Sequence, residues 1–212
     1  MTDVKNTDTD GLKAIHIACS KGYLEIVELL LQYKYGKDMI NECDIDGRTP
    51  LFIACKNNQQ HIVGILLKNK ANVNQTNVKH ISPLYKACQI GNQNIVGLLL
   101  DNFAQNITQM LMQLIEKKES ALYIAFINEC FDIVKLLLDN HADVNLCEEN
   151  GNSPLHAVCL KGNKQIVQLL LAKKSDIQKR NNAEKTLCDV VQNVQGKEKD
   201  TMIKMLNGYK DK

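Results

Sequence analysis

The chain has 212 residues and a nearly balanced charge, with 26 lysine and arginine residues against 24 aspartate and glutamate residues and a net charge of +2. So small a net charge gives little electrostatic attraction to nucleic acids or anionic membranes. Base-specific DNA recognition depends on the forked guanidinium of arginine. Because the chain contains only Arg48 and Arg180, we expect no specific nucleic acid and no membrane among its partners.

The first ten residues, 1–10, are polar and lack the basic start and apolar stretch of a secretory signal. We expect them to form a flexible lead-in. No apolar run elsewhere approaches the length of a membrane span. These features predict a cytoplasmic protein, with the nucleus as a second compartment, although an effector delivered by an unconventional route would share them.

A hexapeptide of the type Ile-Val-x-Leu-Leu-Leu recurs along the chain with little change. The copies begin at Ile26, Ile62, Ile95, Ile133 and Ile166, so the steps between them are 36, 33, 38 and 33 residues. A nearly fixed period in this range is typical of repeat proteins, in which each unit is stabilised by its neighbours. The chain is therefore predicted to be a mainly α repeat solenoid.

The repeat unit is clearest in residues 46–74. Asp46-Gly47 predicts a tight turn, because glycine adopts a positive φ without a side-chain clash. Thr49 is a good N-cap and Pro50 suits the first helical position, so a short first helix begins here. Asn58 tolerates the left-handed conformation and ends that helix. A second helix over about 60–69 carries the hexapeptide, and an extended finger follows it.

This unit resembles the ankyrin repeat. The family pattern Gly-x-Thr-Pro-Leu-His-x-Ala-Ala, followed by Gly-His, Ile-Val-x-Leu-Leu-Leu and Gly-Ala-Asp-Val-Asn, matches almost position for position. Copy five follows it from Gly151 to Asn163, and copy three follows it from Ser82 to Asn92. The resemblance implies an ankyrin array of stacked helix-turn-helix units joined by β-hairpin or extended fingers.

The resemblance also implies a division of the chain into repeats. Five clear copies are expected at about 11–43, 44–76, 77–107, 115–147 and 148–180. A degenerate sixth copy over 181–208, in which Thr186-Leu187 is aligned with Pro154-Leu155, is interpreted as a C-terminal cap, because terminal repeats need a polar outer face. The whole of 11–208 is predicted to form a single ankyrin repeat domain.

Two segments lengthen the period, one around 33–37 and a longer insertion at about 106–118. Insertions in repeat proteins fall in loops on one face, which is often the binding face. The methionine-rich 106–118 segment would then be an adaptable partner-binding turn. Alternatively, it folds back to cover a gap left by the missing turn of copy four. The sequence leaves both interpretations open.

Four cysteines occupy one repeat position: Cys19, Cys55, Cys88 and Cys159. Stacked copies of one position cannot all pair locally, so we expect reduced cysteines that pack between helices. No Cys-x-x-Cys pair occurs, which argues against a structural zinc site.

Catalysis is not expected. His16 and His156 hold the histidine position of the ankyrin motif, and the resemblance implies that they brace their repeats. No phosphate-binding glycine loop, nucleophile elbow or paired carboxylates stand out. We therefore predict a non-enzyme with no cofactor and no metal.

Ankyrin proteins usually bind partners on the concave face, which is built from finger tips and first helices. The matching positions here are Leu12, Ile45, Asp46, Arg48, Lys56, Val78, Lys79, Ile81, Ile90, Ile127, Asn150, Leu160 and Lys161. The apolar members would form the centre of an interface and the basic members its rim. Alternatively, some of the apolar members pack against the neighbouring finger.

The expected function is that of a non-catalytic protein-binding module, acting as an adaptor, an inhibitor or an assembly chaperone. We expect one protein partner and a chain that is monomeric by itself. An alternative is that the chain is a substrate or regulatory subunit of an enzyme. Asn145 resembles the asparagine that β-hydroxylating oxygenases modify in ankyrin repeats, and Asn74 is a weaker match.

Overall fold

The computed structural model describes residues 13–32, 36–102, 119–192 and 197–210. The chain forms two compact units, which span 1–110 (unit 1) and 111–212 (unit 2). Candidate residue Leu12 and the 106–118 insertion lie outside the described residues. The described residues contain helices and turns but no β-strand, which confirms the predicted helical repeat array.

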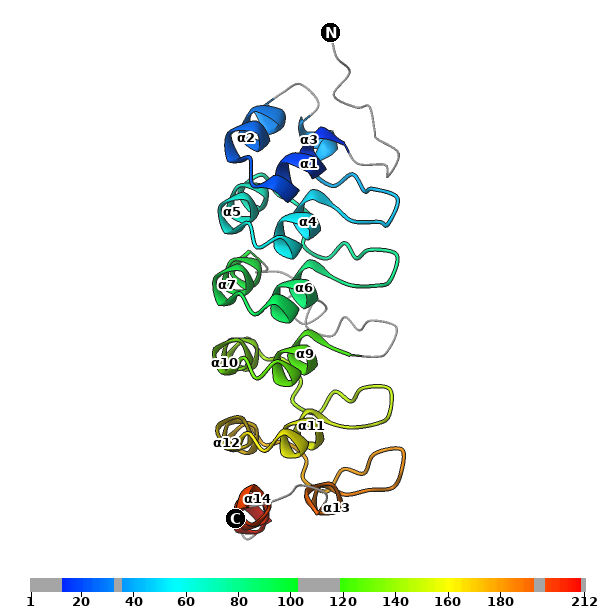
Figure 1. Cartoon of the computed structure of the whole chain (residues 1–212), viewed down its shortest axis with the longest axis vertical. Helices are drawn as coiled ribbons and strands as arrows, with labels where there is room; N and C mark the ends of the chain where they lie inside the picture. The colour runs from blue at the N-terminus through cyan, green and yellow to red at the C-terminus, as the bar shows by residue number, and fades with distance from the viewer. Residues whose placement is uncertain (1–12, 33–35, 103–118, 193–196, 211–212) are drawn as a thin grey trace. The chain divides into compact units, whose positions relative to one another are not determined.

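Unit 1 contains successive helix pairs joined by fingers (Figure 1). Their bounds are α1 (Ala14–Lys21) with α2 (Leu24–Gln32), α4 (Pro50–Lys56) with α5 (Gln60–Lys68), and α6 (Pro83–Ile90) with α7 (Gln93–Asp101); the short α3 (Gly36–Met39) follows α2. The first helices α1, α4 and α6 pack on one another in order, and α2, α5 and α7 form a second row beside them.

Unit 2 repeats the same arrangement. Its pairs are α9 (Ala121–Ile127) with α10 (Phe131–Asp139), α11 (Pro154–Lys161) with α12 (Lys164–Ala172), and α13 (Leu187–Val191) with α14 (Lys197–Lys210). Helix α11 packs between α9 and α13, and α12 packs between α10 and α14. The last pair corresponds to the degenerate sixth copy.

The helix caps follow from the sequence. The Thr49 side chain accepts a hydrogen bond from the Phe52 backbone N–H at 3.1 Å, with Pro50 as the first helical residue. Asn58 has a φ of 59° just after α4, so both ends of this helix are confirmed. Thr186 is the N-cap of α13 and is therefore equivalent to an N-cap serine. The alignment of Thr186 with Pro154 was wrong by one residue, because the side chain that caps the helix precedes the first helical position.

The repeated hexapeptide supplies the core between the two rows of helices. In α5 the stripe consists of Ile62, Val63, Leu66 and Leu67, all buried. Full burial of such a side chain stabilises the fold by about 1.5–3 kcal/mol. The pattern is weaker at α2, where only Val27 is buried and Leu29 is 67% exposed. In the described part of the chain no repeat precedes α1 and α2, so their outer side lacks the cover that the next copies have.

The fingers are tight turns. In the finger before α4, the Asp44 N–H donates to the Arg48 carbonyl at 3.1 Å and the Gly47 N–H to the Asp44 carbonyl at 3.0 Å. The fingers that begin at Asn77, Glu148 and Asn181 repeat the pattern. In each finger only the first of these two bonds joins the two sides of the turn. A single such bond is too little for a strand ladder, which explains why the expected β-hairpins are absent from the described residues.

Candidate partner-binding surface

The finger before α4 is held by one carboxylate. Asp44, only 6% exposed, accepts hydrogen bonds at Oδ1 from the backbone N–H groups of Asp46 at 3.0 Å and Arg48 at 2.8 Å. Its Oδ2 accepts from Arg48 Nε at 2.6 Å, and Arg48 Nη2 lies 3.0 Å from Asp46 Oδ2. The turn is therefore fixed from inside, and Ile45 is left 66% exposed at its tip.

Neighbouring fingers are joined by their backbones. The Val78 N–H donates to the Asp46 carbonyl at 3.0 Å, and in unit 2 the Asn182 N–H donates to the Asn150 carbonyl at 2.9 Å. Gly47 makes the first contact possible, because its φ is +73° and a Cβ there would lie 2.9 Å from the Val78 nitrogen. Successive tips within a unit are thus held at a fixed spacing.

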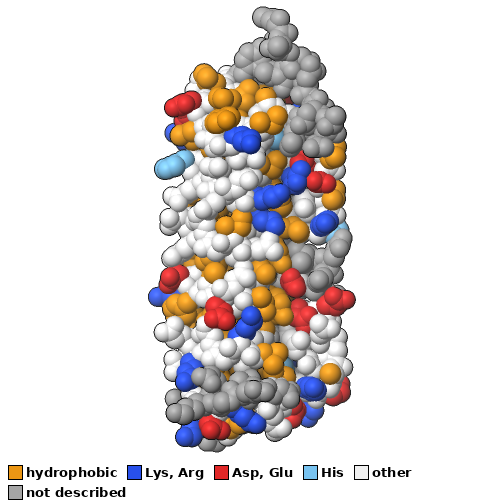
Figure 2. All heavy atoms as spheres, in the orientation of Figure 1, with side chains coloured by type: hydrophobic (Ala, Val, Ile, Leu, Met, Phe, Trp, Pro, Cys, Tyr) orange, Lys and Arg blue, Asp and Glu red, His pale blue; other side chains and the backbone are white. Residues whose placement is uncertain are grey.

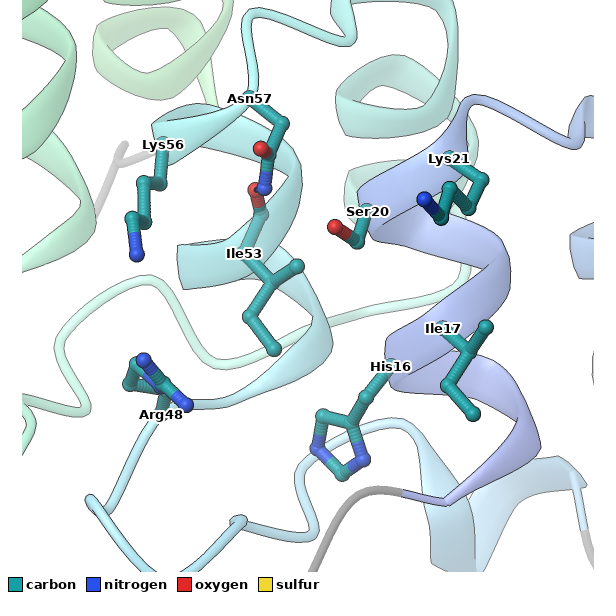
Figure 3. Close-up of a pocket in the computed structure, with 8 residues that line it drawn as sticks. All are labelled: His16, Ile17, Ser20, Lys21, Arg48, Ile53, Lys56 and Asn57. Atoms are coloured by element: carbon teal, nitrogen blue, oxygen red, sulfur yellow. Dashed lines mark hydrogen bonds between the residues drawn. The ribbon is translucent and has the colours of Figure 1, made fainter. Parts of the chain in front are cut away.

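The first recess of unit 1 lies between α1 and α4 and has a volume of about 250 Å³. Figure 3 shows the head groups of Arg48 and Lys56 on one side of it and Ser20 and Lys21 of α1 on the other. The His16 ring faces the same space below Ile53. Two of the predicted residues, Arg48 and Lys56, therefore share this recess.

A second recess lies between α4 and α6, with a volume of about 190 Å³. We call it the lysine recess; its lining residues are Asp46, Arg48, Phe52, Lys56, Asn77, Val78, Lys79, Ile81 and Lys86. In Figure 2, lysine and arginine side chains gather beside hydrophobic ones over α4 and its finger. Burial, together with the positive charge of Lys56, lowers the pKa of Lys86. Lys56 and Lys86 thus line the same recess and carry the same charge.

Not all of the predicted apolar residues are exposed. Four of them are exposed: Ile45, Val78 (60%), Ile90 (41%) and Leu160 (52%). The other two, Ile81 and Ile127, are half-buried. Ile81 closes the finger turn at Asn77, with its N–H 2.9 Å from Asn77 Oδ1, and it also lines the lysine recess. These two side chains are therefore less accessible to a partner than the other four.

The predicted residues fall into two sets. Ile45, Asp46, Arg48, Lys56, Val78, Lys79, Ile81 and Ile90 belong to unit 1, and Ile127, Asn150, Leu160 and Lys161 belong to unit 2. Within unit 1, six of them line the lysine recess. Ile90 lies apart, in a polar recess at the helix turn beside Asn58 and Asn92. Asn150 is anchored by its side-chain amide, which donates to Glu148 Oε2 at 3.0 Å.

Sequence reasoning missed Lys86 as a site residue. It lies in the middle of α6, between the buried Tyr85 and Ala87. Its position in the repeat could have identified it. Lys86 directly follows the Ser-Pro-Leu-Tyr segment, and the side chain at this position of the first helix lies beside the finger.

The two ankyrin-motif histidines brace their repeats. His16 accepts at Nδ1 from the Lys13 N–H at 3.1 Å, and its Nε2 lies 3.0 Å from the Glu42 carbonyl. In the same way His156 Nδ1 is 3.3 Å from the Ser153 nitrogen, and its Nε2 is 3.4 Å from the Lys185 carbonyl. These contacts require an Nε2-protonated neutral ring, which donates to the carbonyl. Burial, the largest effect, lowers the pKa of both rings.

Comparison with known families agrees with this geometry. Profiles described as "Ankyrin repeats (3 copies)" match residues 1–77 and 75–146, and one described as "Ankyrin repeats (many copies)" matches 122–185. The chain belongs to the ankyrin repeat family. No curated protein matches it. Ankyrin repeats are generally protein–protein interaction modules, and the finger and first-helix surface is where this ankyrin chain exposes its recesses and apolar tips.

The two candidate hydroxylation asparagines lie in this ankyrin chain where the second helix passes into the finger. Asn145 is half-buried, and its side-chain oxygen accepts from the Asp176 N–H at 2.8 Å, while its carbonyl accepts from Lys179 Nζ at 3.0 Å. Asn74 is also half-buried, and its N–H donates to Asn72 Oδ1 at 3.0 Å. Asn145 is thus held by its own repeat and by the next one.

Metal binding and membrane crossing find no support in the described ranges of the ankyrin chain. There, no group of three or more His, Cys, Asp or Glu side chains is arranged to hold a metal ion. None of the helices in those ranges combines the length and the apolar character needed to cross a membrane.

Proposed function

We propose that this ankyrin chain is a non-catalytic protein-binding module, acting as an adaptor, an inhibitor or an assembly chaperone in the cytoplasm. Its partner binds the finger tips and first helices. The observation that carries the proposal is the exposure of Ile45 and Val78 on turns that are already fixed. Asp44 holds the first turn and the Val78–Asp46 bond joins the two tips, so little conformational entropy is lost on binding.

A triple variant tests this function. Ile45→Ser, Val78→Ser and Ile90→Ser remove three exposed apolar side chains from unit 1 without changing its charge. Leu29→Ser on α2 is the matched control, because Leu29 is equally exposed but lies on the second row of helices. Both variants should melt cooperatively, since no core residue is changed.

Capture from lysate of the native cells is compared for wild type, the triple variant and the control. A protein retained by wild type and by Leu29→Ser but lost by the triple variant supports the proposal. A protein retained equally by all three contradicts the location of the binding surface in unit 1.

Hydroxylation of Asn145 has less support. The oxygen of its amide is bonded to Asp176 and the residue is half-buried, so an oxygenase would have to open the junction between two repeats to reach its Cβ. The intact mass of the chain from native cells tests this alternative. An added mass of one oxygen atom, located at Asn145 by peptide sequencing, would favour it.

A further inference from the structure

The lysine recess of unit 1 gathers positive charge from three separate segments. Lys56 comes from α4, Lys79 from the next finger and Lys86 from α6, so lysines of three segments line one recess. Among the described residues, no carboxylate lies within ion-pair distance of any of the three.

Arg48, the other cation that lines the recess, is already held by two carboxylates. Arg48 is paired with Asp44 at 2.6 Å and with Asp46 at 3.0 Å. Lys86 donates to the neutral Gln89 side chain at 2.5 Å. Both lysines line the same recess, and burial, followed by the charge of Lys56, lowers the pKa of Lys86, which is the direction expected for repulsion between like charges. A negative group between them would relieve this repulsion and gain charge-assisted hydrogen bonds.

The recess also has an apolar wall. Phe52 is buried beneath it, Ile81 is half-buried, and Val78 is exposed at its edge. Its volume of about 190 Å³ is smaller than the roughly 300–1,000 Å³ of typical small-molecule sites. These dimensions suit one side chain of a larger partner.

We propose that the lysine recess binds a glutamate or aspartate side chain of a protein partner, with an adjacent apolar side chain of that partner against Val78. The carboxylate lies between Lys56 and Lys86, and Lys79 adds attraction from the finger. This inference rests on the proposed function, because it gives the chemistry of the partner at the same surface.

A protein carboxylate suits the recess better than a nucleic acid strand does. Affinity for a phosphate backbone comes from many cations along an extended path, whereas here the three lysines line one small recess. The exposed Val78 has no counterpart on a phosphate backbone.

The test is a selection from a random dodecapeptide phage library against the immobilised full-length chain. The wild type is compared with Lys56→Gln/Lys86→Gln and with the control Lys68→Gln/Lys70→Gln. Lys68 ends α5 and Lys70 follows it; both are exposed and neither lines a recess described above. The two double variants have the same net charge. Circular dichroism melts establish that each is folded.

The expected result is enrichment of peptides that place an acidic residue next to an apolar one. Synthetic copies should bind the Lys56→Gln/Lys86→Gln variant at least about tenfold more weakly than wild type, as loss of a charge-assisted bond predicts. They should bind the Lys68→Gln/Lys70→Gln control like wild type.

Three results would overturn the inference. One is the enrichment of peptides without acidic residues, and a second is acidic peptides that bind both double variants equally. The third is a fluorescent single-stranded oligonucleotide that binds wild type more tightly than the enriched peptides and is lost with Lys56 and Lys86. None of the three decides the proposed function, since the serine triple variant tests that surface without changing a charge.

Discussion

The backbone N–H of Asp176 donates to the side-chain oxygen of Asn145 over 2.8 Å. In unit 1 the N–H of Asn72 makes the same bond to the side-chain oxygen of Asn41 over 2.7 Å. The asparagine that ends one repeat thus satisfies a backbone donor at the start of the next finger. Because repeat proteins gain much of their stability from interfaces between neighbours, this bond ties stability to one side chain at each junction.

Asn145→Ala should therefore lower the free energy of unfolding by about 0.5–1.5 kcal/mol, the net contribution of one hydrogen bond, because the Asp176 donor is exposed to water. Gln165→Ala, on an exposed position of α12, should change it by less than about 0.5 kcal/mol. Urea denaturation followed by circular dichroism measures both. Equal stability of the two variants would show that water replaces the asparagine without loss.

Gly47 and Gly64 should respond in opposite ways to alanine. At Gly47, φ is +73° and a Cβ would lie 2.9 Å from the Val78 nitrogen. Gly47→Ala should therefore lower the free energy of unfolding by about 2–3 kcal/mol, through left-handed strain and a weakened contact between the fingers. Gly64 lies within α5, where a Cβ would meet nothing within 4 Å. Gly64→Ala should therefore raise the free energy of unfolding by about 0.5–1 kcal/mol.

Thermal melting of both alanine variants checks this pair. A lower melting temperature for Gly64→Ala, or an unchanged one for Gly47→Ala, would contradict the geometry of α5 or of the finger contact, respectively.

The fold was predictable because most of the repeats carry the same local signals. The cap at Thr49, the left-handed Asn58 and the buried stripe of α5 each follow from residues within one unit. The site was predictable only in part. The partial burial of Ile81 depends on the recess that it lines, and the position of Lys86 and Lys56 along that same recess depends on how α6 packs on α4. Neither relationship is local, so the sequence pattern alone does not contain it.

Stability should fall as pH is lowered below the ordinary histidine pKa of about 6.5. The folded pKa of His16 and of His156 lies lower, chiefly because both rings are buried. Between the two values the unfolded chain binds more protons, so the free energy of unfolding rises with pH, by up to about 1.4 kcal/mol per pH unit for each ring. The stability that the two neutral rings contribute is fully present above pH about 6.5 and is lost as pH falls through their folded pKa.

A His16→Gln/His156→Gln variant isolates this effect. It should be less stable than wild type at neutral pH, because the caps at Lys13 and Ser153 lose their ring acceptors. Its stability should also change less between neutral pH and mildly acidic pH, as measured by urea denaturation at each pH. A variant that retained the full wild-type slope would assign the pH dependence to other groups.

The cysteines should separate into two classes by reactivity. Cys19, Cys55, Cys88 and Cys159 are buried, whereas Cys43, Cys130, Cys147 and Cys188 are only half-buried. Burial raises the pKa of the Cys19 and Cys159 thiols to about 12, so these thiols carry almost no thiolate at neutral pH and lack access to solvent. Native labelling with iodoacetamide, followed by peptide mass spectrometry, should modify the half-buried class first and leave the buried class unmodified.

Labelling in urea is the control, because unfolding should make all of the cysteines reactive at similar rates. The buried class should then become accessible only with global unfolding of its unit, since each of these cysteines belongs to a first helix and is buried. Native labelling of Cys55 at the rate of Cys147 would contradict this, because it would require α4 to open while the rest of unit 1 remained folded.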